Sequence, residues 1–537
     1  MRRTFQALMF ATALATGAAP LHAEIADDRP IANRPFDPVA HEIFNGLFHP
    51  DSRLPHLLKR DYAAAFEYYG QHGFEPLWHD AAGKPNERAT AIAGLFSRAS
   101  EDGLDPNDYP VFLNVSGSHV PAEIATADIL MTLSVLEYGR HAASGQVSPG
   151  SVSSAISQKP ALPDPIAIIK DAAESPDPVA ALEALQPNNP QYLALKKALK
   201  AELAAKDAPK PVEVPTDLTL RLGVNDARVA VLRARLDILD DPLTANDFDE
   251  TVHDAVVAFQ SDNGLQPDGI AGPRTLGMLN GDSKVSHIDT LVANMERWRW
   301  MPRELSGDGS YVFVNIPFYT VRVMRDGKLD YQGRVVVGKP DHMTPVFSDQ
   351  MESVVVNPYW NVPRSIANNE ILPTLINNPG AGYKYEIRHV SGSRVDPYSV
   401  NWAAYQGSTL PFSFRQPPGP RNALGTVKFL FPNNHDVYLH DTPSRSLFSR
   451  NDRAFSHGCV RLHEPMAFAD AVFKHEPDWT VDKMKRMIGG NESWIKLSYH
   501  LPVHLAYFTA WADDSGTVTY RRDVYGHDRA TLAALGR

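Results

Sequence analysis

Tyr438-Leu439-His440-Asp441 and Ser456-His457-Gly458-Cys459-Val460-Arg461 are the two stretches around which the 537-residue chain is organised. Cys459 is the only cysteine, and His440 precedes it by 19 positions. A cysteine reacts as a thiolate, so it needs a base or a cation close by. Side chains alternate in character along 436–440, which predicts a strand with Tyr438 and His440 on one face. The polar run 441–455 predicts a loop that folds back and brings Cys459 beside His440.

A buried, inert cysteine is the alternative interpretation, because free cysteines often behave as small hydrophobic side chains. The residues around Cys459 argue against it, since Ser456, His457 and Arg461 are polar. Gly458 would let the backbone approach a substrate oxygen closely. The pattern favours a reactive thiol.

These residues resemble the active-site signature of the L,D-transpeptidases. That signature is a His, a gap, Ser or Thr, then His-Gly-Cys, an apolar residue, and Asn or Arg. The resemblance implies acyl transfer through a thioester on Cys459, with His440 as ion-pair partner or general base. It also implies that the third member of the triad is the main-chain carbonyl of Asp441 and not its side chain.

The remaining site residues are expected to assist the reaction, and two of them have an alternative interpretation. Backbone N–H groups around His457, Gly458 and Cys459 are expected to form an oxyanion hole, and we expect His457 to shape it and Ser456 to orient the loop. Tyr438 either adds a hydroxyl donor or is a packed aromatic. Arg461 either holds a substrate carboxylate or forms a salt bridge within the fold.

Composition is typical of a globular protein and argues against nucleic-acid or membrane binding as its main task. The length predicts three or four domains, and 43% hydrophobic with 21% charged residues is typical of a globular chain. A net charge of −11 argues against nucleic acid or an anionic membrane as the main partner. A single cysteine rules out an intrachain disulfide.

Residues 1–23 read as a secretory signal peptide, with Arg2 and Arg3 before a short apolar run and Ala23 at the cut. An uncleaved anchor is the alternative. No other segment approaches 18 apolar residues, so we expect a mature protein without a membrane span, located in the periplasm. An unpaired thiol is a liability in an oxidising compartment, which favours its use in chemistry.

The overall prediction is a multidomain α+β protein. Apolar residues at helical spacing predict a helical scaffold domain over 25–205, followed by a proline-rich, extended linker over 206–217. The sequence pattern over 218–282 predicts a three-helix bundle with turns at Asp268-Gly269 and Gly272-Pro273. The bundle resembles a peptidoglycan-binding module whose signature is met by Asp268, Gly269, Gly272 and Thr275. A spacer without glycan affinity is the alternative.

From residue 311 the pattern becomes β, and 283–525 are expected to form a β-rich catalytic domain. An insertion over 364–425 resembles the capping subdomain of the larger periplasmic L,D-transpeptidases, with a merely structural excursion as the alternative. Residues 526–537 are assigned to a C-terminal tail.

The resemblance implies that a peptidoglycan tetrapeptide donor loses D-Ala and is joined to another stem in a 3→3 cross-link. With water as acceptor the same site is an L,D-carboxypeptidase, and with a lipoprotein lysine it is a protein-to-peptidoglycan ligase. A non-enzymatic wall-binding scaffold is the hypothesis from another class. The expected partners are stem peptides and glycan strands, and no cofactor or metal site is predicted.

Overall fold

The computed structural model describes residues 37–48, 56–113, 115, 120–207, 212–217, 219–238, 244–262, 265–280, 287–306 and 309–537. The expected signal peptide, 1–23, lies outside the described residues. The chain divides into two compact units, Met1–Lys196 with Thr290–Arg537, and Lys197–Asp289. The fold class predicted from the sequence is confirmed: a helical part, a small helical module and a β-rich domain with an insertion.

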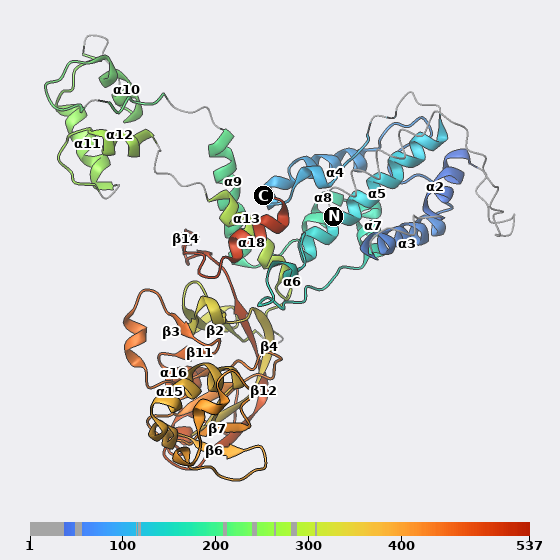
Figure 1. Cartoon of the computed structure of the whole chain (residues 1–537). Coiled ribbons are helices and arrows are strands. Elements are labelled where there is room, and N and C mark those ends of the chain that lie inside the picture. The colour runs from blue at the N-terminus through green and yellow to red at the C-terminus, as the bar shows by residue number, and fades with distance from the viewer. Residues whose placement is uncertain are drawn as a thin grey trace, which may run out of the picture. The chain divides into compact units, whose positions relative to one another are not determined.

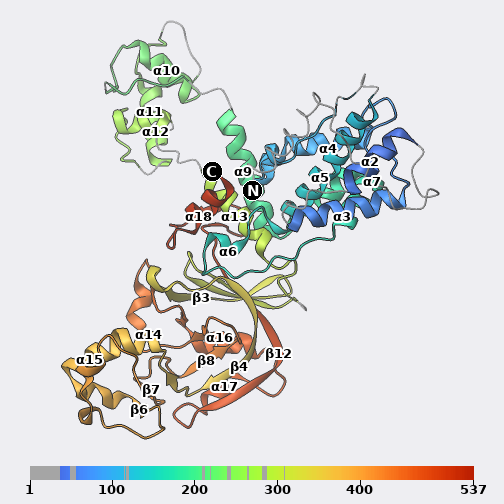
Figure 2. The same ribbon diagram turned by 45° about the vertical axis from the view of Figure 1, so that its right-hand side comes forward.

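The N-terminal part of the first unit is a helical bundle around α5 (Figures 1 and 2). Helix α5 is buried along most of its length, and the carboxylate of Asp128 on it accepts hydrogen bonds from the main-chain N–H groups of Leu77 (2.8 Å) and Trp78 (2.9 Å). The helices are α2 (Pro38–Phe48), α3 (His56–Gln71), α4 (Glu87–Ser97), α5 (Pro121–Ser144), α6 (Pro149–Val152), α7 (Pro165–Glu174), α8 (Pro178–Glu183) and α9 (Pro190–Asp207).

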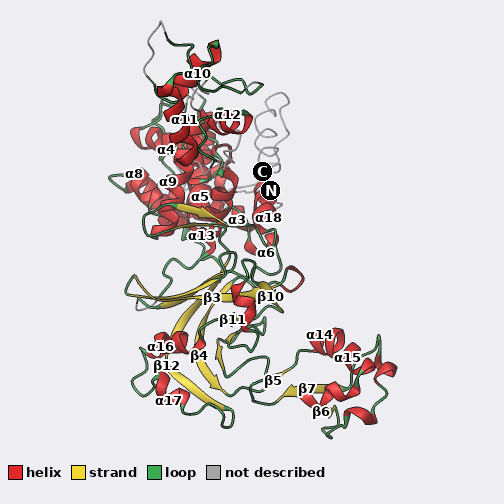
Figure 3. Ribbon diagram, turned by 90° about the vertical axis from the view of Figure 1, so that its left-hand side faces the viewer, coloured by secondary structure: helices red, strands yellow, loops and turns green. Residues whose placement is uncertain are grey.

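The β-rich part contains a sheet in the order β10-β3-β11-β9-β8-β4-β12-β1-β2, in which β2 also pairs with β3 and so closes the sheet (Figure 3). Valine, leucine and phenylalanine side chains from these strands fill one continuous core together with helix α16. The strands are β1 (Tyr311–Asn315), β2 (Thr320–Arg325), β3 (Lys328–Gly338), β4 (Phe347–Val356), β8 (Val427–Leu430), β9 (Leu439–His440), β10 (Ala454–Ser456), β11 (Val460–Leu462) and β12 (Ser493–Ala506). Helices α16 (Pro465–Phe473) and α17 (Val481–Lys485) follow β11.

The insertion between β4 and β8 folds as a small subdomain with its own core, which includes Leu375, Trp402 and Phe414. Its sheet has the order β5-β7-β6 and lies to one side of the main sheet (Figure 3). Its elements are β5 (Trp360–Asn361), α14 (Arg364–Ile366), a π-helical turn (Ala367–Ile371), α15 (Leu372–Asn377), β6 (Glu386–His389) and β7 (Phe412–Gln416).

The helical part and the β-rich part of this unit are joined by side-chain packing and by main-chain hydrogen bonds. Ile156, from the segment after α6, is buried in the core of the sheet domain, and its neighbours hydrogen bond to Val346 through Ser157 N (2.9 Å) and Ala155 O (2.8 Å). Residues 526–537, assigned from the sequence to a tail, include helix α18 (His527–Leu535), which is held by an ion pair between Asp528 and Arg297 of α13 (Ile288–Trp300). A short hairpin of β13 (Ala510–Ala512) and β14 (Val518–Tyr520) precedes it.

The second unit is a three-helix module of α10 (Ala227–Arg235), α11 (Glu250–Asp262) and α12 (Pro273–Asn280). Asp268 accepts hydrogen bonds from Gln260 Nε2 (2.9 Å) and the main-chain N–H of Ile270 (3.0 Å), and Gly269 has φ +68°. These signature residues therefore build a turn. Val214, in the stretch expected to be linker, exchanges two 2.9 Å hydrogen bonds with Asn280 and packs in the core of the module.

Candidate active site

The two stretches quoted first form neighbouring parallel strands, β9 and β11, with Leu439 opposite Val460 and His440 opposite Arg461. Leu439 and Val460 are fully buried in the core. Because side chains alternate along a strand, Tyr438, His440, Cys459 and Arg461 share the other face. Continuing this register by one residue places Cys459 opposite Tyr438. With the usual spacing between strands and rise along a strand, the Cα atoms of Cys459 and His440 are then about 8 Å apart. The sheet thus gathers these four residues, taken from two segments of the chain.

His440 is buried, and its Nδ1 is hydrogen bonded to the main-chain carbonyl of Asp441. Burial, followed by the charge of Arg461, lowers the pKa of the imidazole to about 3, although the carbonyls of Asp441 and Leu424 oppose the shift. The imidazole is therefore neutral at physiological pH. The carboxylate of Asp441 points elsewhere and accepts from Thr426 N (2.9 Å) and Thr442 N (2.7 Å).

Cys459 is half-buried and has the hydroxyl and main-chain N–H of Tyr438 beside its sulfur. Burial raises the pKa of the thiol to about 11, against the opposing effects of Tyr438 and Arg461. Among the described residues no hydrogen bond joins the thiol to His440; the thiol lies 3.9 Å from the carbonyl oxygen of Asp436. Catalytic hydrogen bonds are often long without substrate. Tyr438 and Arg461 would stabilise a thiolate once it forms, whereas the charge of Asp436 opposes it.

The turn before Cys459 is held from both ends. Ser456 Oγ donates to the carbonyl of Cys459 (2.5 Å) and accepts from Gly458 N (3.2 Å). Gly458 has φ +111°, a conformation that other residues rarely adopt. Thr344 Oγ1 donates to the carbonyl of Gly458 (2.7 Å). The turn is fixed by side chains and not only by its own backbone.

The amides expected to form an oxyanion hole are not equivalent. The N–H of Gly458 is engaged by Ser456, because a serine hydroxyl readily accepts from a neighbouring backbone group. In the described part of the chain, the main-chain N–H groups of His457 and Cys459 have no hydrogen-bond partner. This differs from the expectation that all three amides face a substrate oxygen. Two amides and the Tyr438 hydroxyl are the available donors.

Tyr525 is a supporting residue that sequence reasoning missed. Its hydroxyl donates to the carbonyl of Gly338 (2.6 Å) and accepts from Thr344 N (3.2 Å), and burial raises its pKa to about 12. Thr344 in turn holds Gly458. No local pattern around Tyr525 signals this contact, because it joins segments 181 residues apart.

Lys428 is a second residue missed from the sequence. It lies opposite His440 in the register of β8 and β9, and its Nζ is 5.7 Å from the ring centroids of both Tyr438 and Trp494. Burial lowers the pKa of its amine. The alternation along 427–430 would have placed it on the site face, had the pairing of β8 with β9 been known.

Arg461 is the other cation of the site. Its Nε is buried without a hydrogen-bond partner, and no carboxylate pairs with its guanidinium among the described residues. Burial lowers its pKa. Lys428 and Arg461 thus place two cations on the face around Cys459, and the carboxylates of Glu492 and Asp436 also act on this face.

His457 points away from Cys459 toward the inserted subdomain. Its Nε2 pairs with the carboxylate of Glu370, and its ring lies 4.8 Å from that of His342. Glu370 belongs to the π-helical turn, a rare local geometry that is common at functional sites. His457, the second residue before Cys459, therefore contacts the inserted subdomain.

Two further features of the described residues concern a membrane-spanning helix and a cluster of metal-ligating side chains. None of the described helices is long and apolar enough to cross a membrane. One described group, Glu250, His253 and Asp254 on α11, brings potential metal-ligating atoms together, but the carboxylates are exposed. Neither observation bears on the site around Cys459.

Three segments of the chain match known protein families. Residues 63–199 match a "Scaffold domain", residues 225–279 a "Putative peptidoglycan binding domain", and residues 309–481 the "L,D-transpeptidase catalytic domain". The chain contains an L,D-transpeptidase catalytic domain. The L,D-transpeptidase match includes His440, Cys459 and Arg461, and it also spans the inserted subdomain.

One curated relative, named "Putative L,D-transpeptidase", from Haemophilus influenzae, is 36% identical over 260 residues, which are 48% of this chain and 52% of the relative. The match thus spans about half the length of the relative. An L,D-transpeptidase structure from Mycobacterium smegmatis is 14% identical, covering 37% of this chain and 58% of that chain with a TM-score of 0.19. Another from Stackebrandtia nassauensis is 15% identical, covering 55% and 97%, with a TM-score of 0.16. Scores this low support no conclusion about the fold.

Proposed function

We propose that the chain is a peptidoglycan L,D-transpeptidase that forms 3→3 cross-links with Cys459 as its nucleophile. The observation that carries the proposal is the shared face of β9 and β11, with Tyr438, His440, Cys459 and Arg461 side by side. A wall-binding scaffold without activity needs none of these groups. The L,D-transpeptidase domain and the peptidoglycan-binding domain support the same substrate.

The low pKa of His440 and the high pKa of Cys459 favour general-base catalysis over a resting thiolate–imidazolium pair. Nε2 of His440 takes the thiol proton while Sγ of Cys459 attacks the carbonyl carbon of the third stem residue. The bond from that carbon to the terminal D-Ala nitrogen breaks, and the proton passes from His440 to the leaving amine. The products of this half-reaction are an acyl thioester and free D-Ala.

In the second half-reaction, the side-chain amine of an acceptor stem attacks the thioester carbon, loses its proton to His440 and releases Cys459. The negative oxygen formed in each step faces the amides of His457 and Cys459 and the hydroxyl of Tyr438. A single such donor contributes about 3–4 kcal/mol in other enzymes. Arg461 and Lys428 supply positive charge for the stem carboxylates, which suits guanidinium and ammonium groups.

We place the reaction outside the cytoplasm, in the periplasm, because residues 1–23 have the pattern of a signal peptide and peptidoglycan lies there. The peptidoglycan-binding module then holds the enzyme near glycan strands. The cap covers the site from the side of His457 and Glu370.

The direct test is to incubate the purified full-length protein with disaccharide-tetrapeptide and to analyse the products by mass spectrometry. A cross-linked dimer with released D-Ala supports the proposal, and Cys459→Ala should give neither. Tripeptide without dimer would assign the L,D-carboxypeptidase reaction instead, and transfer only to an added lipoprotein peptide would assign the ligase. No D-Ala release under any condition would remove the enzymatic proposal.

Acylation by a carbapenem gives a second measurement that needs no acceptor. We expect one adduct per chain on wild-type protein and none on Cys459→Ala, with the circular dichroism spectrum unchanged. Acylation that persists in Cys459→Ala would point to another nucleophile.

A further inference from the structure

One row of side chains crosses the main sheet from the active site to β12. Its members are paired in order on neighbouring strands: Arg461 on β11, His440 on β9, Lys428 on β8, Val355 on β4 and Trp494 on β12. Apolar neighbours of these residues along each strand pack in the core on the other face of the sheet. Because side chains alternate along a strand, the five members share the face of the active site.

Beyond His440 this row reaches the surface. Trp494 is 57% exposed, although tryptophan side chains are highly buried on average. Nζ of Lys428 lies 5.7 Å from the ring centroids of both Tyr438 and Trp494, so these two rings are at most twice that distance apart. The hydroxyl of Tyr438 lies beside the sulfur of Cys459. A short peptide at Cys459 can therefore also contact an exposed indole ring.

A second row continues this surface. Ser353 of β4 is paired with Leu430 of β8 and with Lys496 of β12. Leu430 and Ser353 are half-buried, and Lys496 is exposed. Because residues two apart on a strand share a face, both rows lie on the same face. We name this surface the β8–β12 strip, and its residues are Lys428, Leu430, Ser353, Val355, Trp494 and Lys496.

The β8–β12 strip contains two lysines and no acidic residue. Glu492, next to Trp494 in the sequence, is a carboxylate that acts on Lys428. This carboxylate already accepts a 2.8 Å hydrogen bond from the main-chain N–H of Tyr359. Two ammonium groups and an exposed aromatic ring suit a peptide that carries carboxylates.

The chemistry proposed for Cys459 decides which peptide reaches the strip. Nε2 of His440 gives a proton to the leaving amine of D-Ala and later takes one from the acceptor amine, so the two amines occupy one position in turn. The acyl part of the donor stays bonded to Sγ and leads away from the reacting carbon in another direction. The strip begins beside His440, where the amines are exchanged.

Length separates the acceptor from the leaving group. His440 and Trp494 are three strands apart, which is about 14 Å at the usual strand spacing. A single D-Ala spans about 4 Å, whereas an extended stem of three or four residues spans about 10–14 Å. D-Ala can thus reach Lys428, but only the longer acceptor can reach Trp494.

We propose that the β8–β12 strip binds the acceptor stem, with the peptide against the ring of Trp494 and its carboxylates facing Lys428 and Lys496. The inference rests on the proposed function for the identity of the peptide. It adds the face of the sheet along which the acceptor approaches the thioester.

Kinetics with two distinguishable substrates separate the acceptor from the donor. The full-length protein receives disaccharide-tetrapeptide as donor and isotopically labelled disaccharide-tripeptide as acceptor, which has no D-Ala to release. Mass spectrometry follows the labelled dimer, and D-Ala release at saturating tripeptide gives the KM for the donor. Trp494→Ala should raise the KM for the tripeptide about tenfold and Lys496→Glu about fivefold, while the KM for the donor changes less than about twofold.

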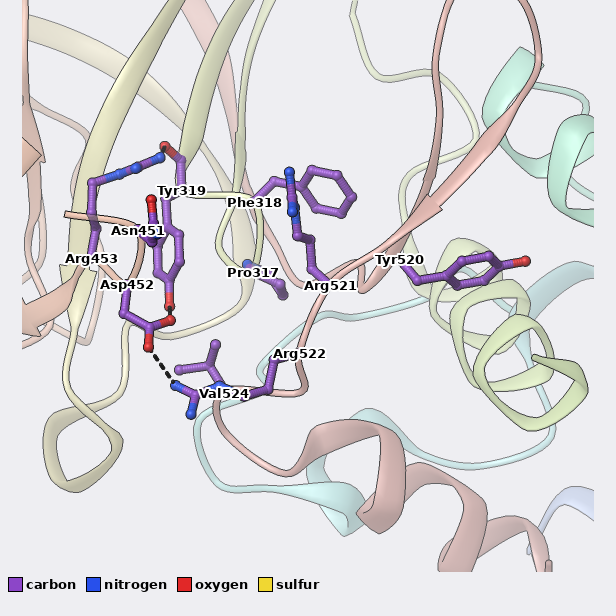
Figure 4. A pocket seen from close by; sticks show the side chains of 10 residues that line it. All are labelled: Pro317, Phe318, Tyr319, Asn451, Asp452, Arg453, Tyr520, Arg521, Arg522 and Val524. Carbon is purple, nitrogen blue, oxygen red and sulfur yellow. Dashed lines mark hydrogen bonds and ion pairs between the residues drawn. The ribbon is translucent and has the colours of Figure 1, made fainter. Parts of the chain in front are cut away.

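Conservative and matched variants control for a general effect of mutation. Trp494→Phe should recover most of the affinity for the tripeptide, because a ring face remains. Arg521→Glu is the control for Lys496→Glu. Arg521 is an exposed arginine in a pocket of about 620 Å³, whose walls come mainly from 317–319, 451–453 and 520–522 and not from the strip (Figure 4). It should leave both KM values unchanged.

Two results would overturn the assignment. One is an unchanged KM for the tripeptide in Trp494→Ala, and the other is an equal rise in the KM for the donor, which would give the strip to the donor stem.

A binding measurement separates this inference from the proposed function. The sugar-free tripeptide should bind the full chain carrying Cys459→Ala, as followed by NMR line broadening, and the added Trp494→Ala should weaken this binding about tenfold. Binding that depends on Trp494, without D-Ala release by the wild type, would refute the cysteine chemistry and leave the strip standing as a peptide site. D-Ala release with binding that does not depend on Trp494 would refute the strip alone.

Discussion

Nδ1 of His440 faces the main-chain carbonyl oxygen of Asp441, and a carbonyl oxygen accepts hydrogen bonds but cannot donate one. Nδ1 must therefore carry the proton, which leaves the lone pair on Nε2 as the base. The hydrogen bond depends on the backbone and not on the side chain of Asp441. This difference can be tested by mutation.

His440→Asn should lower the rate of Cys459 acylation by about 10²- to 10⁴-fold, the usual contribution of a general base. Asp441→Asn should retain most of the activity, because the carbonyl that orients His440 remains. Acylation kinetics by mass spectrometry measure both. An equal loss in Asp441→Asn, with an unchanged melting temperature, would show that the carboxylate is the functional partner.

The protonation states of the site predict a pH profile. The pKa of the thiol is raised to about 11 and that of His440 is lowered to about 3, so both groups stay neutral between these values. Acylation should therefore change little from pH 5 to pH 9. Alkylation of Cys459 by iodoacetamide, which needs the free thiolate, should rise throughout this range. An inflection in either profile between pH 5 and pH 8 would indicate a thiolate–imidazolium pair.

Tyr438→Phe tests the hydroxyl without removing the ring. The hydroxyl hydrogen bonds to Cys459 and lowers its pKa, so its loss should raise the thiol pKa further and slow acylation about tenfold or more. The free energy of unfolding should change little, because the ring still packs beside His440 at 5.7 Å between centroids. Unchanged acylation would mean that Tyr438 is a packing residue only.

The contact of His457 with Glu370 predicts a measurable effect on the cap. Glu370→Gln removes the carboxylate that is hydrogen bonded to Nε2 of His457, and because both side chains are partly exposed the loss should be about 1 kcal/mol or less. Amide exchange over 364–377 should then accelerate by up to about fivefold, with global stability unchanged. Glu386→Gln, in the same subdomain, is the control and should leave exchange unchanged. If Glu370→Gln has no effect on exchange, the ion pair does not restrain the cap.

The sequence predicted the features that follow from local pattern. Alternation along 436–440 predicted that Tyr438 and His440 share a face, although the structure has a strand only at Leu439–His440, and the polar neighbours of Cys459 favoured a reactive thiol. The β-rich domain and the bundle also followed from periodicity and turn residues.

Features that depend on contacts between distant segments could not be predicted in this way. Lys428 joins the site only because β8 pairs with β9, and Tyr525 supports the turn before Cys459 from the end of the chain. The use of the Gly458 amide by Ser456 was missed because it depends on the shape of the turn. Helix α18 was assigned to a tail because its nine residues are short and its buried positions, such as Thr531, include polar side chains.

Ile156 fills a place in the core of the sheet domain, and the backbone on either side of it is hydrogen bonded to Val346. A shortened protein that begins after the helical part would expose that gap to water and leave two main-chain groups of Val346 unpaired. The helical part and the β-rich part therefore cannot be exchanged independently of each other. Recombination between homologues should succeed only when the segment around Ile156 is inherited together with the strand it completes.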